Sequence, residues 1–208
     1  QPEAFRQLEQ AIALNGRNAD ARLLRANLYL ARGNLEAAER EAREALLARE
    51  RFADARNSLG VILIHRRRFD EAIRELRIAA DDVLYREPHL AWGNLGWAYL
   101  EKGATEQALS ALRHAVAIEP RFCVGHYRMG DLHYRSGRFA AAVESLERAI
   151  GVTDPACERL QDAHRLLGVS LMRTDRREDA AAAFRRCRDL GAEAPAGREC
   201  VRFLGMLQ

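Results

Sequence analysis

The amino-acid sequence predicts an all-α fold, a superhelical solenoid of stacked antiparallel helix pairs. The first observation is a small residue that recurs with spacings of 34, 36, 34 and 38 residues, at Ala26, Gly60, Gly96, Gly130 and Gly168. The second is another small residue twelve positions after each of these, at Ala38, Ala72, Ala108, Ala142 and Ala180. A larger side chain at either place would push two packed helices apart, at a cost of about 1–3 kcal/mol. A constant period of about 20–50 residues is the sequence signature of such repeat folds.

The clearest copy of the repeat lies in residues 91–120, AWGNLGWAYLEKGATEQALSALRHAVAIEP. It follows the tetratricopeptide pattern W-x2-L-G-x2-Y, then A-x3-F-x2-A, then P. The matching positions are Trp92, Leu95, Gly96, Tyr99, Gly103, Ala108, Leu112, Ala115 and Pro120. One such unit cannot bury its own apolar face, so adjacent copies must complete the core. The sequence therefore predicts a tetratricopeptide-repeat solenoid.

We expect one repeat domain over residues 1–208, with about six helix pairs of which the first is incomplete. Ala4, Leu8 and Ala11 lie 34 residues before Ala38, Ala42 and Ala45, so residues 3–14 are expected to be the second helix of a partial repeat. The expected boundaries are 1–18 (partial), 19–52, 53–88, 89–122, 123–160 and 161–194, followed by a capping helix at 195–208 that carries Val201, Leu204 and Gly205 on one helical face. The chain is expected to begin inside a longer precursor.

The helix pairs are separated by short turns, and two of the junctions between pairs are longer than the others. The expected pairs are 19–32 with 35–48, 53–66 with 69–81, 89–102 with 105–118, 122–136 with 139–150, and about 158–173 with 177–190. The junction at 81–92 has two additional residues, and the junction at 151–162 has four. Insertions in solenoids map to loops on one edge, where they either serve specificity or reflect tolerated drift.

Charge and hydropathy exclude two classes of partner or location. The 33 basic and 30 acidic residues give a net charge of only +3, which provides no steering field for nucleic acid. No apolar run approaches the roughly 20 residues that a membrane-spanning helix needs. Residues 1–14 form an amphipathic segment and not a signal peptide.

The concave face is the expected binding surface. In tetratricopeptide folds the first helix of each pair lines this face, chiefly through its positions 2, 5, 9, 12 and 13. Counting from Ala19, Ala53, His89, Cys123 and Gln161 predicts a partner-binding groove made of Leu23, Asn27, Leu30, Asn57, Val61, Ile64, Leu90, Trp97, Leu100, Val124, Tyr127, Tyr134, Val169 and Met172. Exposed apolar patches mark binding surfaces, and Trp and Tyr often dominate their energetics. The alternative for any single residue is packing against a neighbouring helix.

We expect no enzymatic activity and no catalytic, cofactor-binding or metal-binding site. The six histidines are scattered over different repeats, and none stands in a recognisable motif with a carboxylate and a nucleophile. Cys123 and His126 are spaced like half of a zinc site, but no second pair completes it. A clamp for the acidic C-terminus of a chaperone is also disfavoured, because Leu23 and Asn57 stand where lysine is expected and only Asn27 fits.

The four cysteines all lie in the C-terminal half, at Cys123, Cys157, Cys187 and Cys200. Two sequential disulfides, Cys123–Cys157 and Cys187–Cys200, fit the predicted topology, because the longer junction brings Cys157 towards Cys123 and the capping helix carries Cys200 towards Cys187. Four cysteines allow three pairings, and four reduced thiols in a cytosolic protein remain the alternative. Disulfides would indicate an oxidising compartment.

Residues 84–103, LYREPHLAWGNLGWAYLEKG, and 120–139, PRFCVGHYRMGDLHYRSGRF, resemble the PilF/PilW/Tgl family of type IV pilus pilotins, and within it the Tgl branch. The resemblance covers nearly the whole chain. It implies a lipoprotein anchored in the outer membrane by an N-terminal lipidated cysteine and facing the periplasm. It also implies a partner, the secretin subunit of the type IV pilus machine, whose multimerisation into the exit pore the family promotes for pilus biogenesis and motility. The family's signal peptide and lipidated cysteine are not in this sequence, as expected for a mature fragment.

Two function hypotheses follow from the sequence. A pilotin would hold an amphipathic or β-rich segment of the secretin monomer in the apolar groove and shield it from aggregation until the subunits assemble. The alternative is a tetratricopeptide scaffold for protein–protein interaction in an unrelated complex.

Overall fold

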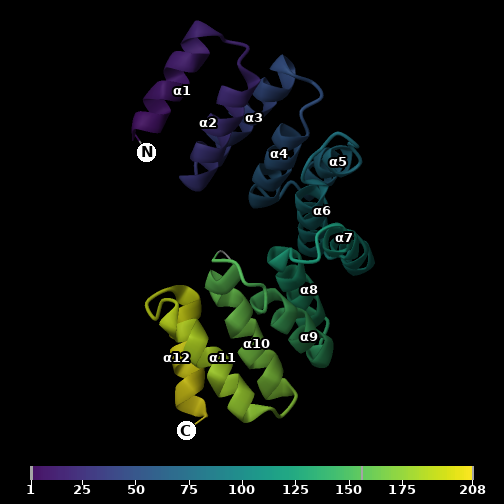
Figure 1. Cartoon of the computed structure of the whole chain (residues 1–208), viewed down its shortest axis with the longest axis vertical. Helices are drawn as coiled ribbons and strands as arrows, with labels where there is room; N and C mark the ends of the chain where they lie inside the picture. Colours follow the sequence, from purple (N-terminus) through teal and green to yellow (C-terminus); the bar gives the residue numbers. More distant parts are fainter. Residues whose placement is uncertain (1, 156, 208) are drawn as a thin grey trace. The chain divides into compact units, whose positions relative to one another are not determined.

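The computed structural model describes residues 2–155 and 157–207, and within these ranges all regular structure is helical (Figure 1). The helices are α1 (Pro2–Leu14), α2 (Ala19–Ala31), α3 (Leu35–Ala48), α4 (Ala53–His65), α5 (Phe69–Ala80), α6 (Pro88–Lys102), α7 (Thr105–Ile118), α8 (Cys123–Arg135), α9 (Phe139–Ile150), α10 (Gln161–Arg173), α11 (Arg177–Asp189) and α12 (Pro195–Met206), with one 3-10 turn, η1 (Cys157–Arg159). The all-α tetratricopeptide prediction is confirmed. Residues 1, 156 and 208 of the expected domain, and the side chain of Ala4, lie outside the described residues.

The chain forms two compact units, residues 1–111 and 112–208, and the boundary falls within α7. The first unit contains α1 to α6, and the second contains α8 to α12. One continuous repeat domain, with the boundaries expected above, stays a prediction.

Helix bounds agree with the sequence to within one or two residues except before α10. The sequence predicts this helix from about residue 158, whereas α10 begins at Gln161. Residues Cys157–Arg159 form the separate turn η1, and Leu160 leaves helical geometry with φ −70° and ψ 75°. The additional residues of this junction therefore form a turn of their own and do not extend the helix.

Small residues bring the two helices of a pair into contact in both units. A Cβ built on Gly60 of α4 would collide with the side chain of Leu76 on α5. A Cβ on Gly130 would collide with Leu146 in the same way, and a Cβ on Gly168 with Phe184. In all three pairs the large side chain lies sixteen residues after the glycine. Each glycine therefore makes room for one large core side chain, which confirms the close approach that the repeat spacing predicts.

The turn inside each pair is built the same way every time. One residue of the turn has a left-handed backbone conformation, and it lies seven positions after the small residue of the first helix. In three repeats it is a glycine, with φ of 73°, 82° and 70° at Gly33, Gly103 and Gly137. Arg67 and Asp175 take this position in the other two repeats, with φ of 60° and 61°. A backbone N–H one residue later donates to the carbonyl oxygen five residues before it, as in the Schellman motif, and so satisfies the helix end.

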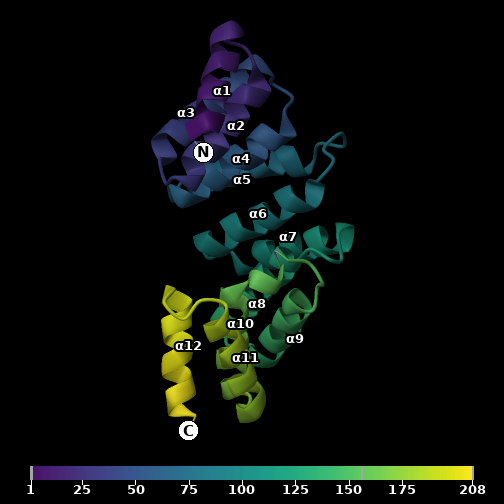
Figure 2. The ribbon, with the colours of Figure 1, turned by 60° about the vertical axis from the view of Figure 1, so that its left-hand side comes forward.

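In the first unit the first helices of successive pairs lie beside one another. Helix α2 contacts α4, and α4 contacts α6, while α3 and α5 pack behind them (Figures 1 and 2). Residues at the contacts are small or aliphatic, and Ala26, Ala38, Leu59 and Leu76 are fully buried. This arrangement presents one face of α2, α4 and α6 together.

The second unit repeats this pattern and ends in α12, which packs against α11 and α10 (Figure 2). Phe203 of α12 stacks on Phe184 of α11, with ring centroids 4.9 Å apart. The buried face of α12 matches the expected one only in part, at Leu204, which packs against the core cluster of this unit. It contains Ala196, Gly197 and Cys200, whereas Val201 and Gly205 are exposed. The backbone at Gly191 and Ala192 comes so close that only glycine fits at Gly197, and this contact sets the rotation of the helix.

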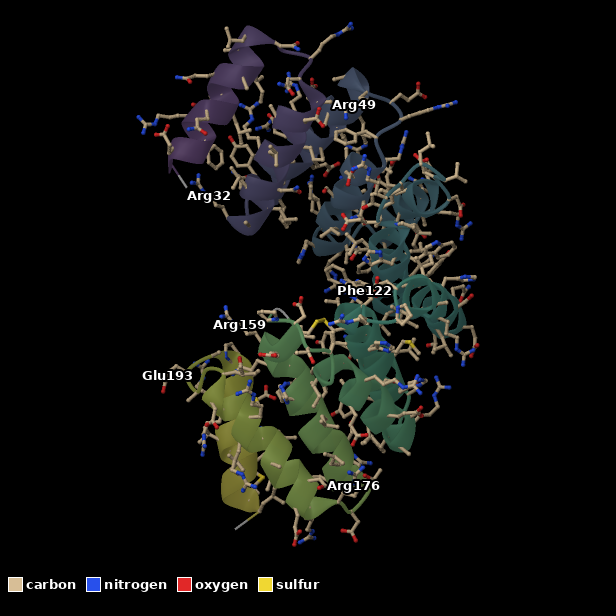
Figure 3. All side chains as sticks on the ribbon, in the orientation of Figure 1. Arg32, Arg49, Phe122, Arg159, Arg176 and Glu193 are labelled. Atoms are coloured by element: carbon tan, nitrogen blue, oxygen red, sulfur yellow. A yellow bond between two sulfur atoms is a disulfide. The ribbon has the colours of Figure 1, made fainter. Side chains whose placement is uncertain are left out.

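Two disulfides link elements of the second unit. Figure 3 draws sulfur atoms in yellow. Cys123 at the start of α8 pairs with Cys157 in η1, with Cα atoms 5.8 Å apart. Cys187 of α11 pairs with Cys200 of α12, with Cα atoms 6.2 Å apart. These are the two sequential pairs that the topology favours, and none of the cysteines in the described residues is free.

Candidate functional site

The sequence-predicted groove residues fall into two sets, one in each unit. The first unit holds nine of them on α2, α4 and α6, and the second holds five on α8 and α10. The first set is Leu23, Asn27, Leu30, Asn57, Val61, Ile64, Leu90, Trp97 and Leu100. The second set is Val124, Tyr127, Tyr134, Val169 and Met172. Their joint action as one binding surface stays a prediction.

Three of the predicted groove residues belong to the core. Leu23, Ile64 and Leu100 are only 9%, 4% and 8% exposed. Leu23, for example, packs with Ala45, Phe52 and Ala55 at the junction of the first two complete pairs. A partner cannot reach these side chains without repacking the helices, so they support the face from behind and do not line it.

The remaining residues of the first unit form a mixed apolar and amide surface. Val61, Leu90 and Trp97 are half-buried, and Asn27 is exposed. The side-chain amide of Asn94 on α6 donates to Asn57 Oδ1 on α4, with 2.8 Å between nitrogen and oxygen. This hydrogen bond holds two first helices together and leaves both amides at the same face. Counting positions in the sequence missed Asn94, because Asn57 is at groove position 5 of its helix whereas Asn94 is at position 6.

Trp97 is braced by a residue that the sequence analysis also missed. The ring of His65, at the end of α4, meets the Trp97 ring edge-to-face with centroids 5.3 Å apart. Such a pair contributes about 0.5–1.5 kcal/mol beyond its buried area. His65 occupies position 13 of its helix, which is a groove position in the tetratricopeptide numbering. Its place in the groove could therefore have been predicted from the sequence by counting.

The set in the second unit is more aromatic and lies against the core. Tyr127, Tyr134, Val169 and Met172 all pack against the core cluster of this unit and remain half-buried. Tyr134 meets Phe139 edge-to-face, with centroids 5.9 Å apart. The guanidinium of Arg173 lies 4.4 Å from the centroid of the same Phe139 ring. These contacts fix the aromatic side chains in place, and a preorganised aromatic surface loses little entropy when a partner binds.

Charged pairs accompany this aromatic set. Asp131 pairs with Arg135 on α8 at 2.9 Å, and Arg165 on α10 pairs with Asp162 at 3.1 Å and with Glu199 at 3.2 Å. Burial, together with the charges of Asp162 and Asp131, raises the pKa of Tyr127 to about 12. Its hydroxyl therefore stays protonated near neutral pH and is a hydrogen-bond donor. The second set thus combines apolar rings, a phenolic donor and balanced charges.

Three histidines of the second unit, His126, His133 and His164, are structural. His126 Nε2 lies 2.9 Å from the carbonyl oxygen of Pro120, and His133 and His164 are buried. Burial, with a smaller effect of Arg186, lowers the pKa of His164 to about 4, and burial with nearby arginines also lowers the pKa of His133. Cys123 is oxidised and is not a thiolate ligand for zinc. Within the described ranges, no three His, Cys, Asp or Glu side chains gather as a metal site would require.

No helix in the described part of the chain combines the length and apolar character that crossing a membrane requires. The longest helix, α6, has 15 residues.

Comparison with known proteins places these repeats in a family. The profile described as Tetratricopeptide repeat matches residues 2–46, 25–83, 66–121 and 127–195. The type IV pilus assembly protein PilF of Pseudomonas aeruginosa is 25% identical over 177 residues, which cover 85% of this chain and 68% of PilF.

Solved structures share the fold. The crystal structure of PilW, a widely conserved type IV pilus biogenesis factor, aligns with a TM-score of 0.82 at 19% identity, covering 96% of this chain and 90% of PilW. The Cut9–Hcn1 structure of the APC/C aligns with a TM-score of 0.85 at 15% identity, covering 99% of this chain and 39% of that one. The fold is thus common to proteins of different complexes. The chain belongs to the tetratricopeptide-repeat family and is similar in sequence to a type IV pilus assembly protein.

Proposed function

We propose that this protein is a non-enzymatic pilotin of the Tgl branch, which binds the secretin subunit of the type IV pilus machine and promotes its multimerisation. The observation that carries the proposal is the sequence similarity to PilF over 85% of this chain. The fold shared with PilW over nearly the whole of both chains agrees with it. In this role the protein serves pilus biogenesis and motility.

The proposed location is the periplasmic face of the outer membrane, with a lipid anchor in the precursor. The two disulfides support an oxidising compartment, because structural disulfides persist in the periplasm and are rare in the cytosol. Both bridges are nearly inaccessible, since the four cysteines are at most 6% exposed.

The proposed mechanism is the shielding of an apolar secretin segment. Val61 and Trp97 in the first unit, and Tyr134 and Met172 in the second, are half-buried and offer apolar surface without being part of the inaccessible core. Apolar surface buried by a partner stabilises a complex by about 25 cal/mol per Å2 before the costs of association are subtracted. An amphipathic or β-rich segment of the secretin monomer would cover these side chains and be kept from aggregating until assembly.

A binding experiment tests this mechanism. The full chain is titrated with detergent-solubilised secretin monomer, and Kd is compared for wild type, Trp97→Ala and Tyr134→Ala. We expect each variant to raise Kd about tenfold or more, because central aromatic residues carry much of the binding energy of an interface. The matched control is Leu47→Ala, which removes an apolar side chain that is 78% exposed on the second helix of a pair. Unchanged Kd in both aromatic variants, with unchanged circular dichroism, would refute the groove assignment.

A scaffold of another complex is the second candidate. The observation in its favour is the equally good alignment with the Cut9–Hcn1 structure of the APC/C. Such a scaffold would bind its own partner through the same faces but would leave the secretin monomer unbound in this titration.

A further inference from the structure

The longer junction between α5 and α6 forms a pocket that the groove does not include. The cavity has a volume of about 980 Å3 and lies wholly within the first unit, between residues 49–54 and 78–87. Its apolar lining includes Phe52, Ala53, Ile78 and Tyr85. We call it the junction pocket. Its volume is within the range of pockets that bind small-molecule ligands and is far larger than an ion requires.

Two adjacent aliphatic side chains stand open to solvent on this junction. Val83 is 95% exposed and Leu84 is 82% exposed, and both line the pocket together with the half-exposed Ile78. Such side chains gain free energy when a partner covers them. The junction therefore offers apolar contact both in the lining of the pocket and at its edge.

The pocket also carries a concentration of negative charge. Asp81 and Asp82 follow directly after α5, whose C-terminal end already carries the negative pole of the helix dipole. Asp54 and Glu87 line the same cavity. Of the three arginines in its lining, Arg49 is paired with Asp20 and lies over the Phe52 ring (Figure 3). Carboxylates outnumber the arginines left to neutralise them, so a cation is favoured at this edge.

The phenol of Tyr85 adds a polar group to the pocket lining. Tyr85 is 8% exposed, and its ring packs with Ala53, Ala79, Ala80 and Ala91. No described residue forms a hydrogen bond with its hydroxyl, which belongs to the pocket lining. Burial, and then the charges of Asp54 and Glu87, raise the pKa of this phenol, so that it stays a donor. The hydroxyl oxygen itself keeps contact with solvent, and an incoming carbonyl oxygen would replace water as its hydrogen-bond acceptor.

We propose that the junction pocket binds an extended segment of a partner polypeptide that presents an apolar side chain flanked by lysine or arginine. The apolar side chain covers the lining at Phe52 and Ile78, the basic side chains face Asp81 and Asp82, and a main-chain carbonyl accepts from the Tyr85 hydroxyl. Charge complementarity selects this occupant over an acidic peptide or an anionic lipid. The proposal does not rest on the pilotin function, because it concerns a different surface.

The test is an NMR titration of the 15N-labelled full chain with two acetylated hexapeptides, one of alternating leucine and lysine and the other of alternating leucine and glutamate. The leucine–lysine peptide is expected to shift the amide signals of residues 78–87, with a Kd that rises with salt. The double variant Asp81→Asn with Asp82→Asn removes two charges and keeps the side-chain oxygen that accepts from the Leu84 N–H. We expect it to raise Kd about three- to tenfold, and Tyr85→Phe to raise it about two- to fivefold.

The matched control is Asp175→Asn with Glu178→Gln, which removes two exposed charges from the second unit. It should leave Kd within about a factor of two. Equal binding of the two peptides, signal shifts that avoid residues 78–87, or an unchanged Kd in the Asp81/Asp82 variant would each overturn the proposal. Sedimentation of the chain with phosphatidylglycerol vesicles through Val83 and Leu84, without peptide binding, would identify a lipid contact and overturn it as well.

Discussion

The two units are built from the same repeat, but different interactions link the helices within each unit. In the first unit, buried Glu39 accepts hydrogen bonds from Arg43 and Arg68 at 2.8 Å and pairs with Arg66, and Glu41 pairs with arginines of α2. The second unit holds all four cysteines in two disulfides. The spacing of small and large apolar residues sets the repeat geometry in both. The polar or covalent link between pairs is therefore free to differ, and each unit should respond to a different condition.

At one position of the first helix, the two units make the same contact with a backbone carbonyl through different side chains. In two pairs of the first unit, position 4 of the first helix is an arginine, Arg22 or Arg56, and each donates to the carbonyl oxygen six residues before it, at 3.0 Å and 3.2 Å. In the second unit His126 makes the equivalent contact with the carbonyl oxygen of Pro120. A guanidinium group is thus exchanged for an imidazole ring.

Reduction should give the largest difference between the units. Breaking both disulfides is expected to lower the stability of the second unit by roughly 2–5 kcal/mol, because the unfolded chain regains the freedom that the links remove. Amide hydrogen exchange, read separately for residues 1–111 and 112–208, measures the effect with and without reductant. The quadruple Cys→Ala variant, without reductant, controls for side reactions. Equal loss of protection in both units would contradict the distinction.

Mild acid should act next, and on the second unit. Burial lowers the pKa of His164 to about 4, so the neutral form is favoured in the folded state. This contribution to stability is complete above the unfolded pKa of about 6.5 and is lost as the pH falls towards the folded value. Between pH 7 and pH 5 the second unit should lose roughly 1–2 kcal/mol.

Urea unfolding at the two pH values, followed by NMR signals of each unit, measures this loss. The variant His164→Gln keeps a neutral polar side chain at the buried position and should reduce the pH dependence of the second unit. An unaltered pH dependence in this variant would show that another group is responsible.

The carboxylate network should give an effect of about the same size as mild acid, but on the first unit. Burial of Glu39 raises its pKa, but hydrogen bonds from Arg43 and Arg68 outweigh burial and lower it below 4.5. The network therefore stabilises the fold above about pH 4.5 and weakens as the pH falls through the lowered value. At pH 7, Glu39→Gln should cost the first unit about 1–2 kcal/mol, because three arginines lose a charged acceptor.

Glu71→Gln is the matched control for this change. It removes a carboxylate of the same network that is a third exposed, and exposed ion pairs contribute only about 0–1 kcal/mol. Thermal unfolding monitored in each unit separates the two variants. If Glu71→Gln costs as much as Glu39→Gln, burial is not what makes the network important.

The sequence predicts the fold well because the repeat is a local pattern. The small residues, the turns and the paired helices recur at a fixed spacing, and the helix bounds follow to within one or two residues. The exception before α10 arises because additional junction residues can either extend a helix or form a turn, and only packing decides between them. The rotation of α12 likewise depends on a backbone contact at Gly197 that no periodicity reveals.

The surfaces are harder to predict, because they depend on contacts between repeats. Counting positions places Leu23, Ile64 and Leu100 in the groove, but the adjacent helix covers them. The residues around Glu39 in the sequence suggest an exposed charge. In the structure Glu39 is buried against Arg66 and Arg68, which lie 27 and 29 residues later in the chain. The length of the junction at 81–92 is visible in the sequence, whereas the burial of Tyr85 and the exposure of Val83 are not.

The most direct test of the proposed function is the amount of heat- and detergent-resistant secretin oligomer in membranes of cells with and without this gene. The account predicts that the oligomer is lost while the secretin monomer remains, and that wild-type protein restores the oligomer better than Trp97→Ala or Tyr134→Ala. An unchanged amount of oligomer in cells without the gene would contradict the pilotin function and leave a tetratricopeptide scaffold with another partner.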